Sequence, residues 1–143
     1  MRIGGLDEKL AALLERPLVG VLGTLTPSGS PHLTAVWYAV RGSEIVVSTA
    51  ASSQKAANVR AHPVAELCVN AGPVGPCVTA RGEARITGPA SVELVGELAR
   101  RYLGEVEGAR YMQIRDPHAT SVVISIKPTS WRVWDVDSAM AGS

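Results

Sequence analysis

Seven short runs of apolar and β-branched residues recur along this chain, and turn-forming residues separate several of them. The runs lie at 18–25, 31–40, 44–49, 64–70, 77–87, 120–127 and 129–136. A turn at 27–30 joins the first two runs, and a hairpin loop at 41–43 joins the next two. The pattern predicts six or seven antiparallel strands. It does not fit the alternating β-α units of a parallel sheet.

Helical patterns fill the remaining gaps. They cover 6–15, the stretch from a polar turn to Ala61, the stretch from Pro89 to Leu103, and a further piece over 108–115. We expect one domain over 1–143, with a frayed tail at 138–143. Antiparallel sheets of this size usually close into small barrels, which removes their edges. A barrel this small cannot enclose a large ligand, so a cofactor would lie outside it, in a groove completed by a second subunit.

The composition excludes several classes of protein. Hydrophobic residues make up 46% of the 143 residues and charged residues 19%, as in a folded globular domain. The net charge of +1 argues against a nucleic-acid binder. No apolar run approaches the roughly 20 residues that span a membrane. The first residues lack a signal-type apolar segment, so we expect a cytoplasmic protein.

The sequence gives no support to a metal site or to nucleophilic catalysis. The three histidines are scattered singly, and Cys68 and Cys77 form no zinc-binding motif. A disulfide between these cysteines is one alternative, and two reduced thiols, as in most cytoplasmic proteins, are the other. No nucleotide-binding or hydrolase motif occurs. An enzyme with so few acid–base groups needs a cofactor to supply its chemistry.

The stretch from Ser48 to Asn58 is the strongest candidate for a binding site. A strand ends there, a small polar turn follows, and a helix begins near Ser52 and Ser53, which can cap it. Free backbone N–H groups at a helix start favour an anion. Lys55 places a cation in the first turn, where the helix dipole disfavours one, and a nearby phosphate would explain it. A capped surface helix with a solvated lysine is the simpler alternative.

Four pieces of the sequence resemble the flavin/deazaflavin oxidoreductases of the split β-barrel superfamily, which is related to pyridoxamine 5′-phosphate oxidase. The pieces are 20–25 (GVLGTL), 29–38 (GSPHLTAVWY), 53–58 (SQKAAN) and 130–134 (SWRVW). Their combination most resembles the actinobacterial branch that uses the deazaflavin coenzyme F420. The resemblance implies a mainly β fold with inserted helices, an FMN-binding type of split barrel, and a homodimer. It also implies hydride transfer between F420 and an unsaturated small-molecule substrate.

The resemblance assigns cofactor-binding roles to residues in four groups. The residues that would hold the cofactor phosphate and brace the turn beside it are Ser53, Gln54, Lys55 and Asn58. Those that would line the tricyclic ring are Thr34, Ala35, Val36 and Trp37. Those beside the ribityl chain are Ser48 and Thr49. Those that would close the groove from the other subunit are Val78 and Thr79. No catalytic side chain is implied.

Two departures from the pyridoxamine 5′-phosphate oxidases proper bear on cofactor and substrate. Those enzymes tend to have Arg-Lys where this chain has Gln54-Lys55, which weakens the case for FMN. They also have an Arg-x-His motif near the C-terminus, which 131–134 lacks, so vitamin B6 oxidation is not expected. Arg41 and Arg60 are candidates for the acidic tail of F420, or ordinary surface arginines. An FMN-dependent oxidase or reductase, and a non-catalytic cofactor- or tetrapyrrole-binding module, stay open as alternatives.

Overall fold

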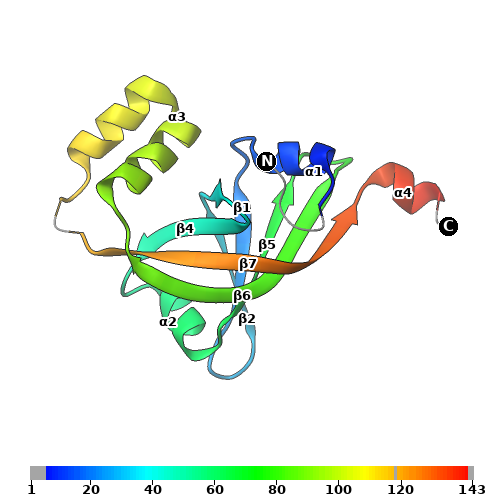
Figure 1. Ribbon diagram of the computed structural model, residues 1–143, viewed down its shortest axis with the longest axis horizontal. Helices are drawn as coiled ribbons and strands as arrows, with labels where there is room; N and C mark the ends of the chain where they lie inside the picture. The colour runs from blue at the N-terminus through cyan, green and yellow to red at the C-terminus, as the bar shows by residue number, and fades with distance from the viewer. Residues whose placement is uncertain (1–5, 118, 142–143) are drawn as a thin grey trace.

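The computed structural model describes residues 6–117 and 119–141, and its strands form one antiparallel sheet in the order β2-β1-β5-β6-β7-β4-β3 (Figure 1). The strands are β1 (Gly20–Leu25), β2 (Pro31–Val36), β3 (Ala39–Arg41), β4 (Glu44–Ala50), β5 (Val64–Asn70), β6 (Cys77–Pro89) and β7 (Ser121–Trp134). The helices are α1 (Glu8–Leu14), α2 (Gln54–Ala61), α3 (Val92–Ile114) and α4 (Val136–Ala141). The predicted class, mainly β with inserted helices and antiparallel strands, is confirmed.

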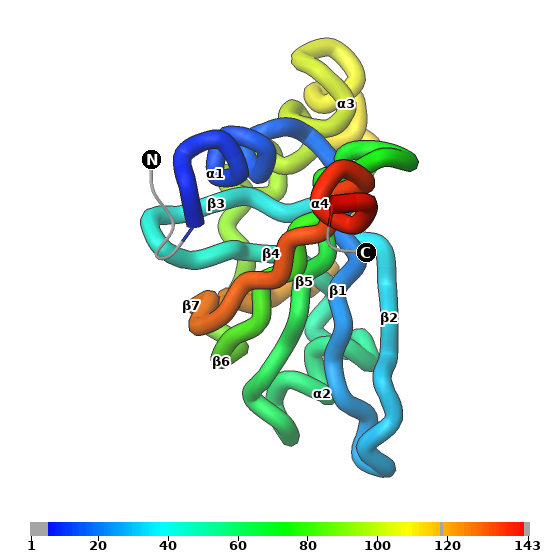
Figure 2. The backbone as a smooth tube through the Cα atoms, turned by 90° about the vertical axis from the view of Figure 1, so that its right-hand side faces the viewer, coloured from blue at the N-terminus to red at the C-terminus, as the bar shows by residue number. Residues whose placement is uncertain are grey.

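The connection between β2 and β3 requires the sheet to curl. These strands are the opposite edges of the sheet, yet only Trp37 and Tyr38 separate them in the chain. The two edges therefore meet at this crossing, and the sheet forms a barrel that is split there. The predicted single strand over 31–40 is wrong for this reason, because the chain leaves one edge at Val36 and joins the other at Ala39. Figure 2 shows β1 and β2 as a long hairpin that extends to one end of the barrel, with α2 beside it.

The longest strand pair, β6 and β7, differs from the prediction of two strands over 120–136. Pro128 does not end β7, because it lies at a bulge where the register shifts between Arg81 and Gly82. The predicted bulge at Gly82 is therefore confirmed. A Cβ atom at Gly82 would lie 1.9 Å from the carbonyl oxygen of Lys127, so the close approach of the two strands requires glycine.

The helix α3 joins the two helical pieces predicted over 89–103 and 108–115. Gly104 has a φ of 86°, and the helix folds back at that residue into two segments (Figure 1). The predicted start at Pro89 is wrong, because Pro89 ends β6. The side chain of Ser91 caps the helix instead, and accepts a hydrogen bond from the Leu94 N–H at 3.1 Å.

Two groups of buried side chains hold these elements together. The larger fills the barrel and includes Leu22, Tyr38, Leu67 and Ile124, each at most 1% exposed. The smaller lies between the first segment of α3 and the edge formed by β3, β4 and β7, and consists of Ala39, Val46, Leu98 and Val123. The smaller group therefore fixes α3 beside the split of the barrel.

The chain ends of the described region differ in part from expectation. The predicted frayed tail over 138–143 forms α4 as far as Ala141, because the carboxylate of Asp135 accepts a hydrogen bond from the Ser138 N–H at 2.6 Å. Residues 142–143 lie outside the described residues. Cys68 and Cys77 are free thiols, with their Sγ atoms 3.3 Å apart. Within the described residues, no helix has the length and apolar character needed to cross a membrane.

Candidate functional site

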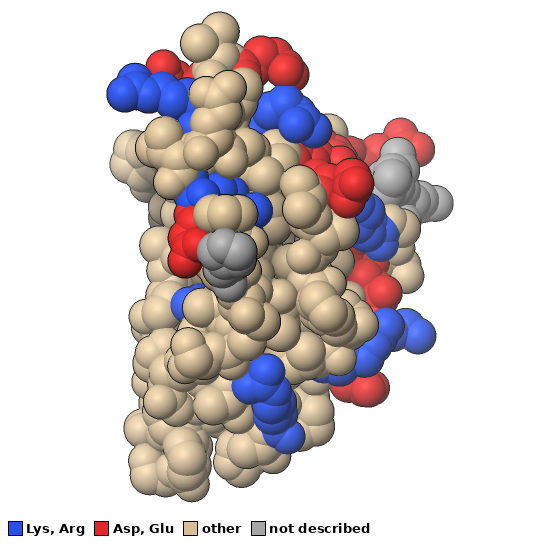
Figure 3. Space-filling view, turned by 90° about the vertical axis from the view of Figure 1, so that its left-hand side faces the viewer, with Lys and Arg blue, Asp and Glu red and all other residues tan. Residues whose placement is uncertain are grey.

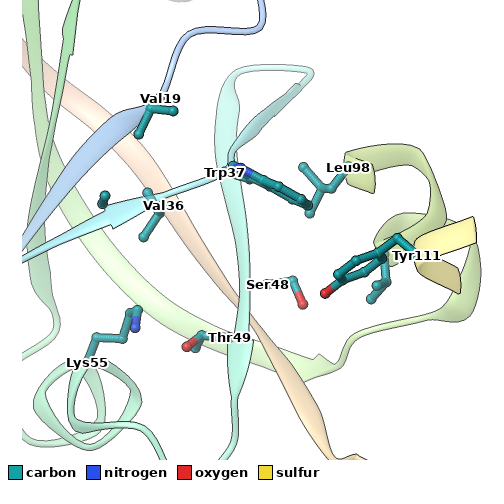
Figure 4. Close-up of a pocket in the computed structure, with 10 residues that line it drawn as sticks. Val19, Val36, Trp37, Ser48, Thr49, Lys55, Leu98 and Tyr111 are labelled. Atoms are coloured by element: carbon teal, nitrogen blue, oxygen red, sulfur yellow. The ribbon is translucent and has the colours of Figure 1, made fainter. Parts of the chain in front are cut away.

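A pocket of about 570 Å³ opens at the split of the barrel. This volume is in the range of small-molecule and cofactor sites. The pocket is lined from five directions by the segment before β1, the end of β2 with the crossing, β4, α2 and α3 (Figure 4). The lining residues are Val19, Ala35, Val36, Trp37, Ser48, Thr49, Lys55, Val95, Leu98 and Tyr111.

The two ends of the pocket differ in chemistry. Lys55 and Thr49 lie at one end, and the side chains of Trp37, Leu98 and Tyr111 lie at the other (Figure 4). Lys55 is the one charged residue in the lining, and its ammonium group has no ion-pair partner in the part of the chain that the structure describes. The pocket therefore suits an elongated ligand with an anionic group at one end and an apolar body.

The first turn of α2 is held in place by side-chain hydrogen bonds. Ser53 Oγ accepts from the Ala56 N–H at 3.2 Å and from the Thr49 hydroxyl at 3.1 Å. Gln54 donates to Asn58 Oδ1 at 2.7 Å, and Asn58 Nδ2 donates to the buried hydroxyl of Thr24 at 3.1 Å. These residues anchor α2 against β1 and β4. They fix the helix start at which Lys55 stands.

Thr34 has a buried hydroxyl that the protein does not satisfy. Its Oγ1 atom lies out of reach of solvent and makes no hydrogen bond to any described residue. Thr34 is on the same face of β2 as Val36, which lines the pocket. A buried polar atom without a partner is costly, and a bound ligand is one explanation for it.

The apolar end of the pocket is built around Trp37. Its ring stacks on Tyr102, with centroids 5.2 Å apart and an interplanar angle of 6°, and meets Tyr111 at 5.9 Å and 57°. The hydroxyl of Tyr102 donates towards the carbonyls of Leu18 and Tyr38 at 3.0 and 3.2 Å. Both segments of α3 therefore contribute to the position of the indole, Tyr102 from the first and Tyr111 from the second.

The structure brings together half of the residues that the sequence predicted for the site. The predicted residues that line the pocket are Ala35, Val36, Trp37, Ser48, Thr49 and Lys55. The predicted residues that lie beside it are Thr34, Ser53, Gln54 and Asn58. Val78 is 1% exposed and packs in the core of its own chain, so its side chain is not available to close the groove of another subunit. Thr79 lies on the outer face of the sheet, beside Arg132 and Trp134.

Sequence reasoning missed the pocket residues outside β2, the crossing after it, β4 and α2. They are Val19, Val95, Leu98 and Tyr111. Val95 and Leu98 lie in the helix predicted from Pro89 to Leu103, and the sequence does not indicate what that helix packs against. Arg41 and Arg60 both have protein partners: Arg41 pairs with Glu97, and Arg60 donates to the carbonyl of Ala51 at 3.1 Å.

Comparison with known proteins gives the family. The model of the family described as pyridoxamine 5′-phosphate oxidase matches residues 6–135. This chain belongs to the pyridoxamine 5′-phosphate oxidase family. The fold is the split β-barrel of that family, whose proteins bind flavin-type cofactors and include oxidoreductases.

Solved structures with a similar fold cover most of this chain. An F420 reductase is 27% identical, with a TM-score of 0.72 over 89% of this chain and 98% of its own. A conserved hypothetical protein, Rv2991, from Mycobacterium tuberculosis is 31% identical, with a TM-score of 0.74 over 94% of this chain and 88% of its own. An FMN-binding, pyridoxamine 5′-phosphate oxidase-related protein from Nostoc punctiforme is 14% identical, with a TM-score of 0.69 over 96% and 88%, and shares the fold alone.

Proposed function

We propose that this chain is an F420-dependent oxidoreductase that acts on an unsaturated small molecule. The observation that carries the proposal is the pocket at the split of the barrel, with Lys55, which has no ion-pair partner among the described residues, at one end and aromatic side chains at the other. The 27% identity to an F420 reductase supports F420 over FMN. The phosphate contacts support the same choice, since Gln54 precedes Lys55 where FMN-dependent relatives tend to have arginine.

The residues of the pocket fit a phosphate-bearing, ring-containing cofactor. Lys55 would hold the phosphate with a charge-assisted hydrogen bond, at a helix start whose free N–H groups favour an anion. The unsatisfied hydroxyl of Thr34 would gain a partner. When bound, the coenzyme supplies the hydride. The protein orients the two reactants, and Val36, Leu98 and Trp37 provide apolar walls for them.

We also propose that a second copy of the chain covers the outer face of the sheet. Val21, Leu33 and Trp134 on this face are 40%, 67% and 49% exposed. Edge strands are usually protected by charged side chains, yet 17–40, which includes the edge strand β2, contains none. Figure 3 shows a broad uncharged surface in its lower left, where β1 and β2 lie. Beside it Glu66 pairs with Arg132 at 3.2 Å, so this face carries charges of both signs, and a two-fold contact could match each with its opposite on the second copy.

Cofactor binding tests the function. Purified chain freed of cofactor is titrated with F420 and, separately, with FMN, and affinity is read from coenzyme fluorescence. We expect tighter binding of F420. Lys55→Met should weaken it about 10- to 100-fold, since a hydrogen bond to a charged group is lost. Lys127→Met, which changes an exposed lysine on β7, is the matched control and should leave affinity unchanged.

The outcomes separate the alternatives. If Lys55→Met and Lys127→Met lose affinity for F420 equally, Lys55 does not belong to the binding site. Preference for FMN would keep the pocket and replace the coenzyme. Binding of F420 with no turnover of any acceptor would favour a carrier.

The proposed contact with a second copy is tested by measuring the oligomeric state in analytical ultracentrifugation. Leu33→Glu should yield monomers, and Val106→Glu, at a 79% exposed residue of α3, should not.

A further inference from the structure

We infer that Tyr111 determines substrate specificity, by donating a hydrogen bond to an acceptor oxygen of a planar substrate that packs against the aromatic end of the pocket. The inference rests on the proposed function, since it concerns the substrate half of the same pocket. It assigns a role to the second segment of α3, which contributes Tyr111 and no other lining residue to that pocket.

The fold of α3 fixes Tyr111 at the pocket. After the reversal at Gly104, Gly108 lies against the backbone of Arg100, where a Cβ atom would come within 2.8 Å of the Arg100 Cα atom. One turn further along, Met112 packs over Gly96. Because Gly108 allows this close packing, the second segment returns along the first and places Tyr111 opposite the barrel. Its ring then contacts Trp37 at 5.9 Å.

The hydroxyl of Tyr111 is free to bind a ligand. It makes no hydrogen bond to any described residue, and it points into the pocket towards Ser48 (Figure 4). Tyr111 is 37% exposed and lines the pocket. By contrast, the hydroxyl of Tyr102 is fully used in hydrogen bonds to the backbone. Of the two tyrosines that contact Trp37, Tyr111 is therefore the one available for recognition.

The surroundings of this hydroxyl indicate the chemical class of its ligand. Trp37, Leu98 and Val95 form the rest of this end of the pocket, and none of them carries a charge. The one cation of the lining, Lys55, lies at the opposite end (Figure 4). A flat, uncharged molecule gains most from aromatic walls, and an oxygen acceptor on it would pair with the phenol O–H.

Binding of two matched probes tests the inference without any turnover. The full-length chain, without cofactor, is titrated by calorimetry with 2-acetylnaphthalene, which is flat and carries a carbonyl oxygen, and with 2-ethylnaphthalene, which lacks the oxygen. We expect Tyr111→Phe to weaken binding of the acetyl probe about three- to tenfold, the usual effect of one neutral hydrogen bond. Affinity for the ethyl probe should stay within about twofold. Ser48→Ala removes the neighbouring hydroxyl, which is the competing donor, and should weaken binding of the acetyl probe less than Tyr111→Phe does.

Several results would overturn the inference. They are an equal effect of Tyr111→Phe on the two probes, a selective loss in Ser48→Ala instead, or no binding of either probe to the parent chain. Because Phe retains the ring, an unchanged melting temperature would show that Tyr111→Phe is folded. Failure here is distinct from failure of the proposed function, because F420 affinity and its dependence on Lys55 are measured separately at the other end of the pocket.

Discussion

The indole of Trp37 and the phenol ring of Tyr102 lie parallel, with their centroids 5.2 Å apart. This contact joins the crossing between the two edges of the sheet to the first segment of α3. The hydroxyl of Tyr102 extends the connection, because it also accepts a hydrogen bond from the Tyr38 N–H at 3.1 Å. One tyrosine thus supports the pocket wall and satisfies backbone groups that belong to no strand.

Tyr102→Phe should lower the free energy of unfolding by about 1–3 kcal/mol, because partly buried backbone groups of Leu18 and Tyr38 lose their partner. Urea denaturation measures the change. Tyr111→Phe is the matched control, since its hydroxyl has no partner among the described residues, and its stability should stay within about 0.5 kcal/mol of the parent. Similar losses of unfolding free energy in Tyr102→Phe and Tyr111→Phe would mean that the hydrogen bonds of Tyr102 contribute nothing to stability.

Asn58 and Thr24 should be energetically coupled. Asn58 is 1% exposed and Thr24 is 3% exposed, and the bond between them is the link from α2 to β1. Asn58→Ala leaves the Thr24 hydroxyl buried and unpaired, at a cost of about 1–3 kcal/mol. With Thr24→Val in the same chain, the loss should be smaller than the sum of the two single losses. A double-mutant cycle measures this difference, and strict additivity would show that the two side chains act independently.

Gly82→Ala should destabilise the barrel by several kcal/mol or prevent folding. The new methyl group would meet the Lys127 carbonyl of the neighbouring strand, and backbone cannot yield as a side chain can. Gly23→Ala on β1 is the control, because its Cβ atom would lie 3.2 Å from the flexible end of the Leu33 side chain and at an ordinary contact distance of 3.8 Å from the Glu66 carbonyl oxygen. Thermal unfolding of the two variants provides the comparison. An unaltered Gly82→Ala melting temperature would show that the bulge can rearrange.

The sequence was informative where local rules decide the structure. Strand β5 matches its predicted bounds, and the helix start near Ser53 is capped as expected, because alternation and capping depend on near neighbours. The break at Trp37 was not predictable, since it follows from the meeting of two sheet edges. The continuity of β7 through Pro128 depends likewise on a bulge shared with β6. Tyr111 was missed as a pocket residue because a reversal at Gly104, between two helical patterns, brings it there.

Stability should fall as the pH rises from about 10 to about 12, in part through Tyr38. Burial raises the pKa of its phenol from 10.0 to about 12. A raised pKa means that the folded chain holds the proton more tightly than the unfolded chain does. The contribution of the protonated Tyr38 phenol to the free energy of unfolding is therefore complete below pH 10. It is lost as the pH approaches 12, and the total loss is up to about 3 kcal/mol.

Tyr38→Phe separates this effect from the other groups that titrate at alkaline pH. The variant should be less stable than the parent at pH 8, because it loses the hydrogen bond from the phenol to the Leu14 carbonyl at 3.0 Å. It should also lose less stability between pH 10 and 12. Parallel urea-denaturation curves for the parent and Tyr38→Phe across this range would mean that Tyr38 ionises equally in the folded and unfolded chains.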